Sequence, residues 1–117
     1  MASEILIFVT CATRREANRL AHALVQANLA ACVNIFANPI HSIYRWKGKI
    51  ETANEILLLI KSTRVRFREL EREIRRRHSY EVPEIIALPI VSGSKPYLRW
   101  IRQSVRPVRK TVRRKQR

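Results

Sequence analysis

The chain has 117 residues, a formal net charge of +15, and 46% hydrophobic residues. A chain of this length forms one domain with a small core, and such domains often bury further apolar surface by association. All nine acidic residues are glutamate, which excludes sites built on aspartate, such as an EF-hand loop or a Walker B motif.

We expect neither a targeting signal nor a membrane span in the N-terminal region. Its apolar run over 5–9 is far shorter than a signal-peptide core or a transmembrane helix, and Glu4 precedes it. The two cysteines, Cys11 and Cys32, lack the spacing of a zinc motif and are expected to be reduced thiols. We therefore expect a soluble protein of the cytoplasm that has no membrane partner.

The first half of the chain predicts a helix between strands. Residues 4–10 are almost wholly apolar, which is typical of a central strand, and Thr13 with Glu16 forms a capping box for a helix over 14–28. A second strand over 31–36 is interrupted at Asn38-Pro39 and resumes at 40–46. A tight turn at Lys47-Gly48 returns the chain into a long strand from 49 to 60.

The second half repeats the pattern. A helix over 64–77 has a thin apolar spine of Phe67, Leu70 and Ile74. A strand follows over 85–91, and a short helix over 95–104 begins with a proline in its first turn. The order βαββαβ plus a C-terminal helix predicts an α+β, ferredoxin-like split βαβ fold with one antiparallel sheet. The predicted domain spans 1–104, and a basic tail spans 105–117.

The hairpin over 40–54 is too polar and aromatic in its outer part to be ordinary core. Its segment Tyr44-Arg45-Trp46 has two interpretations, packing against another subunit or forming the wall of a pocket. Both hold at once if the pocket lies between subunits.

The stretch from His78 to Ile90 has the most specific composition in the chain. His78 follows three arginines at the end of a helix and precedes Tyr80, Glu81 and Glu84. It either caps the helix or contributes to a cleft as a polar or metal-binding group. No serine or cysteine beside it indicates a nucleophile, so we expect no enzyme.

Nucleic-acid binding has two possible signals in this sequence. An RNA-recognition sheet needs aromatic residues on its third strand, and residues 48–62 contain none. Residues 102–117 hold eight Lys or Arg and no acid, which allows non-specific contact with phosphates. We expect a solubilising tail and no nucleic-acid partner beyond such contact.

Five separated blocks resemble the CutA family of divalent-cation tolerance proteins, and together they run over about 4–102. They are AACVNI at 31–36, SIYRWKGKIE at 42–51, EILLLIKS at 55–62, H-x-YEVPEIIALPI at 78–90 and YLRWI at 97–101. Their order and spacing agree with that family throughout.

The resemblance implies a ferredoxin-like subunit in a homotrimer, similar in architecture to the P-II signalling proteins, with the long hairpin reaching a neighbouring subunit. It also implies a role in the response to divalent metals, copper above all, through ligand binding at clefts between subunits. The polar residues that match the family's shared set are Cys32, Tyr44, Trp46, Lys49, Glu51, Lys61, His78, Tyr80 and Glu84.

Copper ligands proposed for some family members are a cysteine late in the first strand and two consecutive histidines. Those positions are Val9, Arg77 and His78 in this sequence, so His78 is the candidate metal ligand. We expect Cu²⁺ or another divalent cation to bind weakly. The alternative is a P-II-like sensor that binds a small anionic metabolite.

Overall fold

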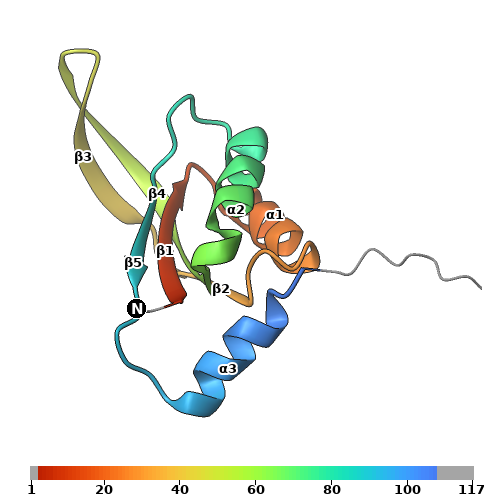
Figure 1. Cartoon of the computed structure of the whole chain (residues 1–117). Helices are drawn as coiled ribbons and strands as arrows, with labels where there is room; N and C mark the ends of the chain where they lie inside the picture. The colour runs from red at the N-terminus through yellow and green to blue at the C-terminus, as the bar shows by residue number, and fades with distance from the viewer. Residues whose placement is uncertain (1–2, 108–117) are drawn as a thin grey trace, which may run out of the picture.

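A computed structural model describes residues 3–107 and shows an α+β fold with a long two-stranded arm (Figure 1). The predicted order of strands and helices is confirmed, with the second strand divided in two. The elements are β1 (Glu4–Cys11), α1 (Arg14–Gln26), β2 (Cys32–Ile35), β3 (Ile40–Trp46), β4 (Lys49–Thr63), α2 (Arg64–Arg77), β5 (Ile85–Pro89) and α3 (Lys95–Ser104).

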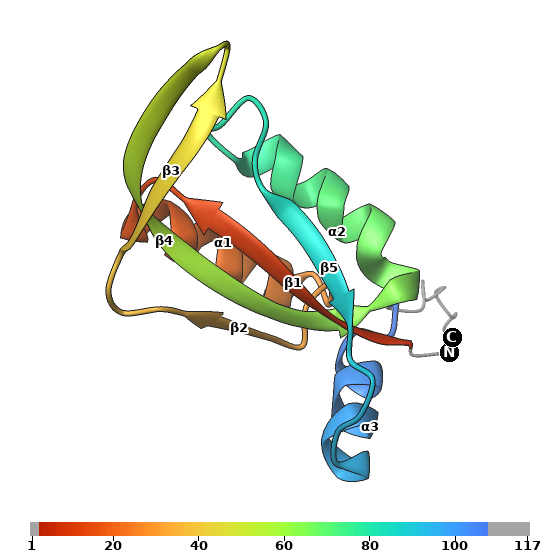
Figure 2. The same ribbon diagram turned by 90° about the vertical axis from the view of Figure 1, so that its left-hand side faces the viewer.

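The sheet has the order β2–β4–β1–β5, and every described pair of neighbours is antiparallel. The inner half of β4 lies between β2 and β1, whereas its outer half pairs with β3 to form the arm (Figure 2). Lys47 and Gly48 connect the arm strands with φ angles of 51° and 81°, as the turn chemistry predicts. The arm therefore extends beyond the hydrophobic core of the domain.

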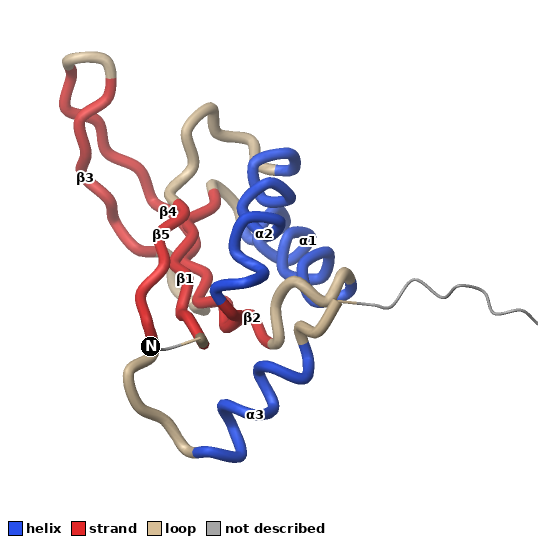
Figure 3. The backbone as a smooth tube through the Cα atoms, viewed as in Figure 1, coloured by secondary structure: helices blue, strands red, loops and turns tan. Residues whose placement is uncertain are grey.

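Helices α1 and α2 cover one face of the sheet, so the hydrophobic core lies between the helices and that face (Figure 3). Alternation along each strand selects the side chains that point toward the helices. The fully buried side chains of this core include Ile7, Val9, Leu24, Leu58, Ile60, Leu70 and Ile74.

The start of α1 confirms half of the predicted capping box. Thr13 Oγ1 accepts a hydrogen bond of 3.1 Å from the Glu16 amide. A capping box also has a hydrogen bond from the Thr13 amide to the Glu16 carboxylate. That part of the prediction is wrong, because the carboxylate accepts hydrogen bonds from Ser79 instead. The helix ends at Gln26, two residues earlier than predicted, and Asn28 follows in the left-handed region with φ 58°.

Replacing Thr13 with Ala is expected to lower the free energy of unfolding by about 1 kcal/mol, because the first turn of α1 loses its side-chain cap. Urea denaturation at a fixed protein concentration measures the change. Thr13→Ser keeps the accepting hydroxyl oxygen and should remain close to the wild type. An equal loss of stability in both variants would contradict the capping role.

Helix α2 buries one residue that its apolar pattern does not predict. Leu70 and Ile74 are fully buried, as expected, and Phe67 is partly buried against the same core. Arg66 is also buried, and its guanidinium donates to the Asn28 carbonyl and pairs with Glu69 at 2.9 Å. The arginine thereby ties α2 to the end of α1.

Strand β5 ends at Pro89, two residues earlier than predicted, and pairs with β1 at the edge of the sheet. Helix α3 then returns to the core through Ile101 and Val105, which are 0% and 2% exposed. Arg102 also pairs with the buried Glu4 at 2.7 Å. The predicted tail over 105–117 therefore begins with a buried residue, and its residues 108–117 lie outside the described part of the chain.

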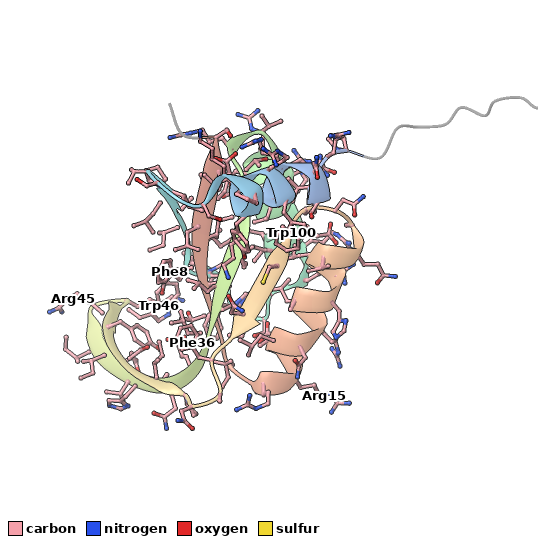
Figure 4. The ribbon with its side chains drawn as sticks, turned by 90° about the horizontal axis from the view of Figure 1, so that it is seen from below. Phe8, Arg15, Phe36, Arg45, Trp46 and Trp100 are labelled. Atoms are coloured by element: carbon pink, nitrogen blue, oxygen red, sulfur yellow. The ribbon has the colours of Figure 1, made fainter. Side chains whose placement is uncertain are left out.

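The second face of the sheet is apolar, and no described helix covers it. Phe8 pairs with Leu59 on one side and with Ile86 on the other, so their side chains share this face. Figure 4 shows Phe8 and Phe36 on the side of the sheet opposite α1. We call this surface the open face; its large apolar residues are Leu6, Phe8, Phe36, Leu57, Leu59, Ile86 and Leu88.

Candidate functional site

A cleft of about 810 Å³ lies between the arm and the segment 79–84 that joins α2 to β5. We call this segment the cleft loop. Strand β3 supplies one wall with Tyr44 and Trp46, and the cleft loop supplies the opposite wall. Thr10 at the end of β1 and Glu55 in the middle of β4 also line it. Figure 2 shows the cleft loop arching beside the arm.

Tyr80 connects the cleft loop to the sheet. Its hydroxyl donates a hydrogen bond of 2.9 Å to the carboxylate of Glu55, which is 8% exposed. Burial and the neighbouring Glu55 carboxylate raise the pKa of Tyr80, so the phenol stays protonated and remains a donor. Its ring also packs on the ring of His78 at a centroid distance of 4.8 Å.

His78 lies behind the cleft wall, with a side chain that is 0% exposed. Nε2 lies 2.8 Å from the Thr10 carbonyl oxygen, so this nitrogen carries the proton and donates. Nδ1 accepts a hydrogen bond of 3.0 Å from the Tyr80 amide. These two hydrogen bonds assign the proton to Nε2. They also link the end of β1 to the cleft loop through His78.

Glu16 joins the same cluster from the first turn of α1. Its carboxylate accepts hydrogen bonds from the amide and the hydroxyl of Ser79, at 2.7 Å and 3.0 Å. One carboxylate oxygen also lies 3.5 Å from Nδ1 of His78. The start of α1 and the end of α2 are thus connected through polar side chains.

Cys11 completes a group of three possible metal donors with Glu16 and His78. One donor atom from each residue lies within 4.8 Å of the other two. Burial raises the pKa of the Cys11 thiol to about 12, so the free thiol is neutral. We call these three residues the donor cluster. Thiolate sulfur, imidazole nitrogen and carboxylate oxygen together are a ligand set suited to zinc or copper.

The cleft in front of the donor cluster is acidic, although the chain as a whole is strongly basic. Glu55, Glu81 and Glu84 line it, and no lysine or arginine is among its described lining residues. Burial, with a smaller contribution from Glu55, raises the pKa of Glu84 above its ordinary value. The cleft therefore favours cations over anions.

The structure brings together part of the predicted site and separates the rest. Tyr44, Trp46, Tyr80 and Glu84 line one cleft, with His78 directly behind it. The remaining four residues of the predicted set, in two pairs, do not line the cleft: Cys32, Lys61, Lys49 and Glu51.

These two pairs lie in different parts of β4 and its neighbours. The Lys61 ammonium donates to Asn34 and lies 3.8 Å from the Cys32 sulfur, across the β2–β4 pairing. Lys49 and Glu51 lie in the arm, opposite Trp46 and Tyr44. The predicted cleft lies between subunits, so the assignment of these four residues to it stays a prediction.

Several residues of the site are absent from the predicted set, among them Cys11, Glu16 and Glu55. Glu16 matched a capping box, and that local interpretation hid its contact with Ser79. Glu55 stands where β4 changes from polar to apolar, a position that could have signalled a buried carboxylate. Cys11 has no local signal, because its partners lie five and 67 positions away in the chain.

The fold is a ferredoxin-like α+β domain with an extended hairpin, as shown by the split βαβ order, the antiparallel sheet and the arm that projects beside a polar cleft. Residues 5–104 match the family described as CutA1 divalent ion tolerance protein. The chain belongs to this family.

Individual relatives are similar along most of this chain. Protein CutA of Homo sapiens is 45% identical over 105 residues, which are 90% of this chain and 58% of the human protein. The divalent-cation tolerance protein CutA of Thermus thermophilus is 43% identical over 101 residues, which are 86% of this chain and 97% of that protein. This chain thus spans little more than half of the human relative.

A solved structure of CutA1 from Oryza sativa has the same fold, with a TM-score of 0.85 and 40% identity. The match covers 90% of this chain and 95% of that one. Within residues 3–107, none of the helices has the length and apolar character needed to cross a membrane.

Proposed function

We propose that this protein responds to divalent transition-metal cations by binding them weakly at the donor cluster, as a non-enzymatic protein of the cytoplasm. The observation that carries the proposal is the convergence of Cys11, Glu16 and His78 within 4.8 Å. The names of the family and of the Thermus relative, which refer to divalent-ion tolerance, support the same class of ligand.

The chemistry of the donors favours Cu²⁺ and Zn²⁺ over Mg²⁺ or Ca²⁺. Hard cations prefer sites made entirely of oxygen, whereas sulfur and imidazole nitrogen select softer metals. Among divalent ions of the first transition row, the ordinary affinity order places Cu²⁺ highest. In this proposal His78 has the metal-binding role that the resemblance implies, but with Cys11 and Glu16 as partners instead of residues 9 and 77.

Binding at the donor cluster has to break existing contacts, which is the reason for weak affinity. A cation at Nδ1 of His78 displaces the Tyr80 amide, and a cation on Glu16 competes with Ser79. The Cys11 thiol also has to lose its proton. Since Ser79 and Tyr80 line the cleft, metal binding would move the cleft loop and change the shape of the cleft.

The acidic cleft provides the route by which a cation approaches. Glu55, Glu81 and Glu84 lower the local potential in front of Thr10 and Ser79, behind which the donor cluster lies. A small anionic metabolite, the ligand of a P-II-like sensor, would be repelled by the same three carboxylates. The lining of the cleft therefore supports a metal ligand over the anionic alternative.

A homotrimer is the proposed assembly, with the cleft completed by a neighbouring subunit. The open face exposes large apolar side chains such as Ile86 at 51% and Leu88 at 46%. An apolar surface of this kind is typical of an interface. The arm exposes Ile43 and Ile50 as well, at 67% and 61%, so a neighbour in contact with the arm would bury them beside the cleft.

The test is isothermal titration of Cu²⁺ and Zn²⁺ into the wild type, Cys11→Ala and Cys32→Ala. Both cysteines are free thiols, but only Cys11 belongs to the donor cluster. We expect Cys11→Ala to weaken binding at least about tenfold, because one of three ligands is lost. Cys32→Ala should bind like the wild type. Equal binding by all three proteins would remove the donor cluster as the metal site.

A further inference from the structure

Helix α2 presents a strongly basic surface, separated from the acidic cleft by the cleft loop, whose Glu81 and Pro83 line both. Its 14 residues include seven arginines and three glutamates. A groove of about 650 Å³ lies between this helix and the cleft loop, and four of those arginines line it. The complete lining is Arg68, Glu71, Arg72, Arg75, Arg76, Glu81 and Pro83.

Three of these arginines form a continuous stripe. With 3.6 residues per turn, Arg68, Arg72 and Arg75 fall within an arc of roughly 60°, and a rise of 1.5 Å per residue spreads them over about 10 Å. All three are exposed, and none forms an ion pair with another described residue. We call them the arginine stripe.

Three neighbouring arginines of α2 differ from those of the stripe, because each of them forms an ion pair with a glutamate of the same helix. Arg76 and Arg77 share Glu73 at 2.6 Å each, and Arg66 is held by Glu69. Glu71 and Glu81 in the groove offset part of the positive charge, but with Arg76 already paired to Glu73 the three guanidiniums of the stripe still exceed these two carboxylates. The groove therefore has uncompensated positive charge arranged along a line.

We propose that the arginine stripe binds the phosphate backbone of a nucleic acid without reading its sequence. Guanidinium groups bind phosphate oxygens in a bidentate manner, and a spread of about 10 Å exceeds one phosphate but matches several on a strand. The net charge of +15 favours the same class of partner. This site is separate from the donor cluster, and it does not require the basic residues after 107.

The groove fits a nucleic acid better than an anionic lipid surface. Helices that bind membranes place large apolar side chains beside their basic residues, so that these side chains enter the acyl layer. In this groove Pro83 is the one apolar residue among the described lining. A chain of phosphates needs no such insertion, because its affinity arises from counterion release.

The test is fluorescence anisotropy with a labelled single-stranded DNA of about 20 nucleotides and with its duplex, at several salt concentrations. The proteins are the full-length wild type, R68E/R72E and the control R15E/R19E. The control changes two exposed arginines of α1 at the same spacing, so both variants have the same net charge. Figure 4 shows Arg15 pointing outward from α1.

We expect R68E/R72E to bind at least about tenfold more weakly than R15E/R19E. The slope of log affinity against log salt for the duplex should fall by about 2 in R68E/R72E, since each phosphate contact contributes roughly 0.9. Circular dichroism of both variants verifies that the helices remain folded. Equal weakening by the two variants would overturn the stripe as a site and leave only the effect of net charge.

Two competition experiments separate nucleic acid from other sources of phosphate. Neither ATP nor vesicles of phosphatidylserine and phosphatidylcholine should displace the DNA at an equal phosphate concentration. Displacement by ATP would assign the groove to small phosphate compounds, and displacement by vesicles would assign it to a membrane surface. Either result would overturn the proposal, as would a wild type that does not bind DNA.

Discussion

A variant that carries Phe8→Glu and Leu59→Glu is expected to be a folded monomer under conditions in which the wild type is expected to sediment as a trimer. The two residues are paired neighbours in β1 and β4, and both point to the open face, away from the helices. Each apolar side chain of this size contributes about 1.5–3 kcal/mol when it is buried. Each buried glutamate also adds a desolvation cost. Sedimentation velocity at micromolar concentration measures the outcome.

The matched control carries Val25→Glu and Val65→Glu. These valines are exposed on α1 and α2, which cover the other face of the sheet, and the change in net charge is the same. The control should remain a trimer. A stable wild-type monomer at micromolar concentration, or dissociation of both variants, would contradict the open face as the subunit interface.

Replacing His78 with Ala is expected to lower the free energy of unfolding by about 2–4 kcal/mol and to abolish the Cys11-dependent binding of Cu²⁺. The Thr10 carbonyl and the Tyr80 amide both lose their hydrogen-bond partner, and each group left unpaired costs about 1–3 kcal/mol. The fully buried side chain also leaves a cavity. Urea denaturation and isothermal titration measure the two effects separately.

His22→Ala is the control, because His22 is an exposed histidine of α1 outside the donor cluster. It should change neither stability nor metal binding. If His78→Ala is destabilised but binds Cu²⁺ like the wild type, His78 positions the cleft loop and is not a ligand. If His78→Ala is as stable as the wild type, its two hydrogen bonds do not hold the cleft loop.

Local patterns in the sequence were sufficient to predict the elements of this fold. The apolar run over 4–10, the cap at Thr13 and the Lys47-Gly48 turn each act over a few residues, and the structure confirms all three. Boundaries differ by at most three residues: β4 continues three residues beyond its predicted end, and β5 ends two residues early, where its pairing with β1 stops. The resemblance that the motifs indicated is confirmed by the match over 5–104.

The sequence alone therefore determined the fold class and the family, and the resemblance implied an inter-subunit cleft to which Tyr44, Trp46, Tyr80 and Glu84 were assigned. Only the tertiary structure decided that His78 is buried, that Glu16 contacts Ser79 across 63 positions, and that Cys11 completes a donor cluster. The reason is physical: periodicity and capping depend on neighbours within a few residues. A site depends on side chains that the packing of α1 and α2 on the sheet brings together from distant parts of the chain.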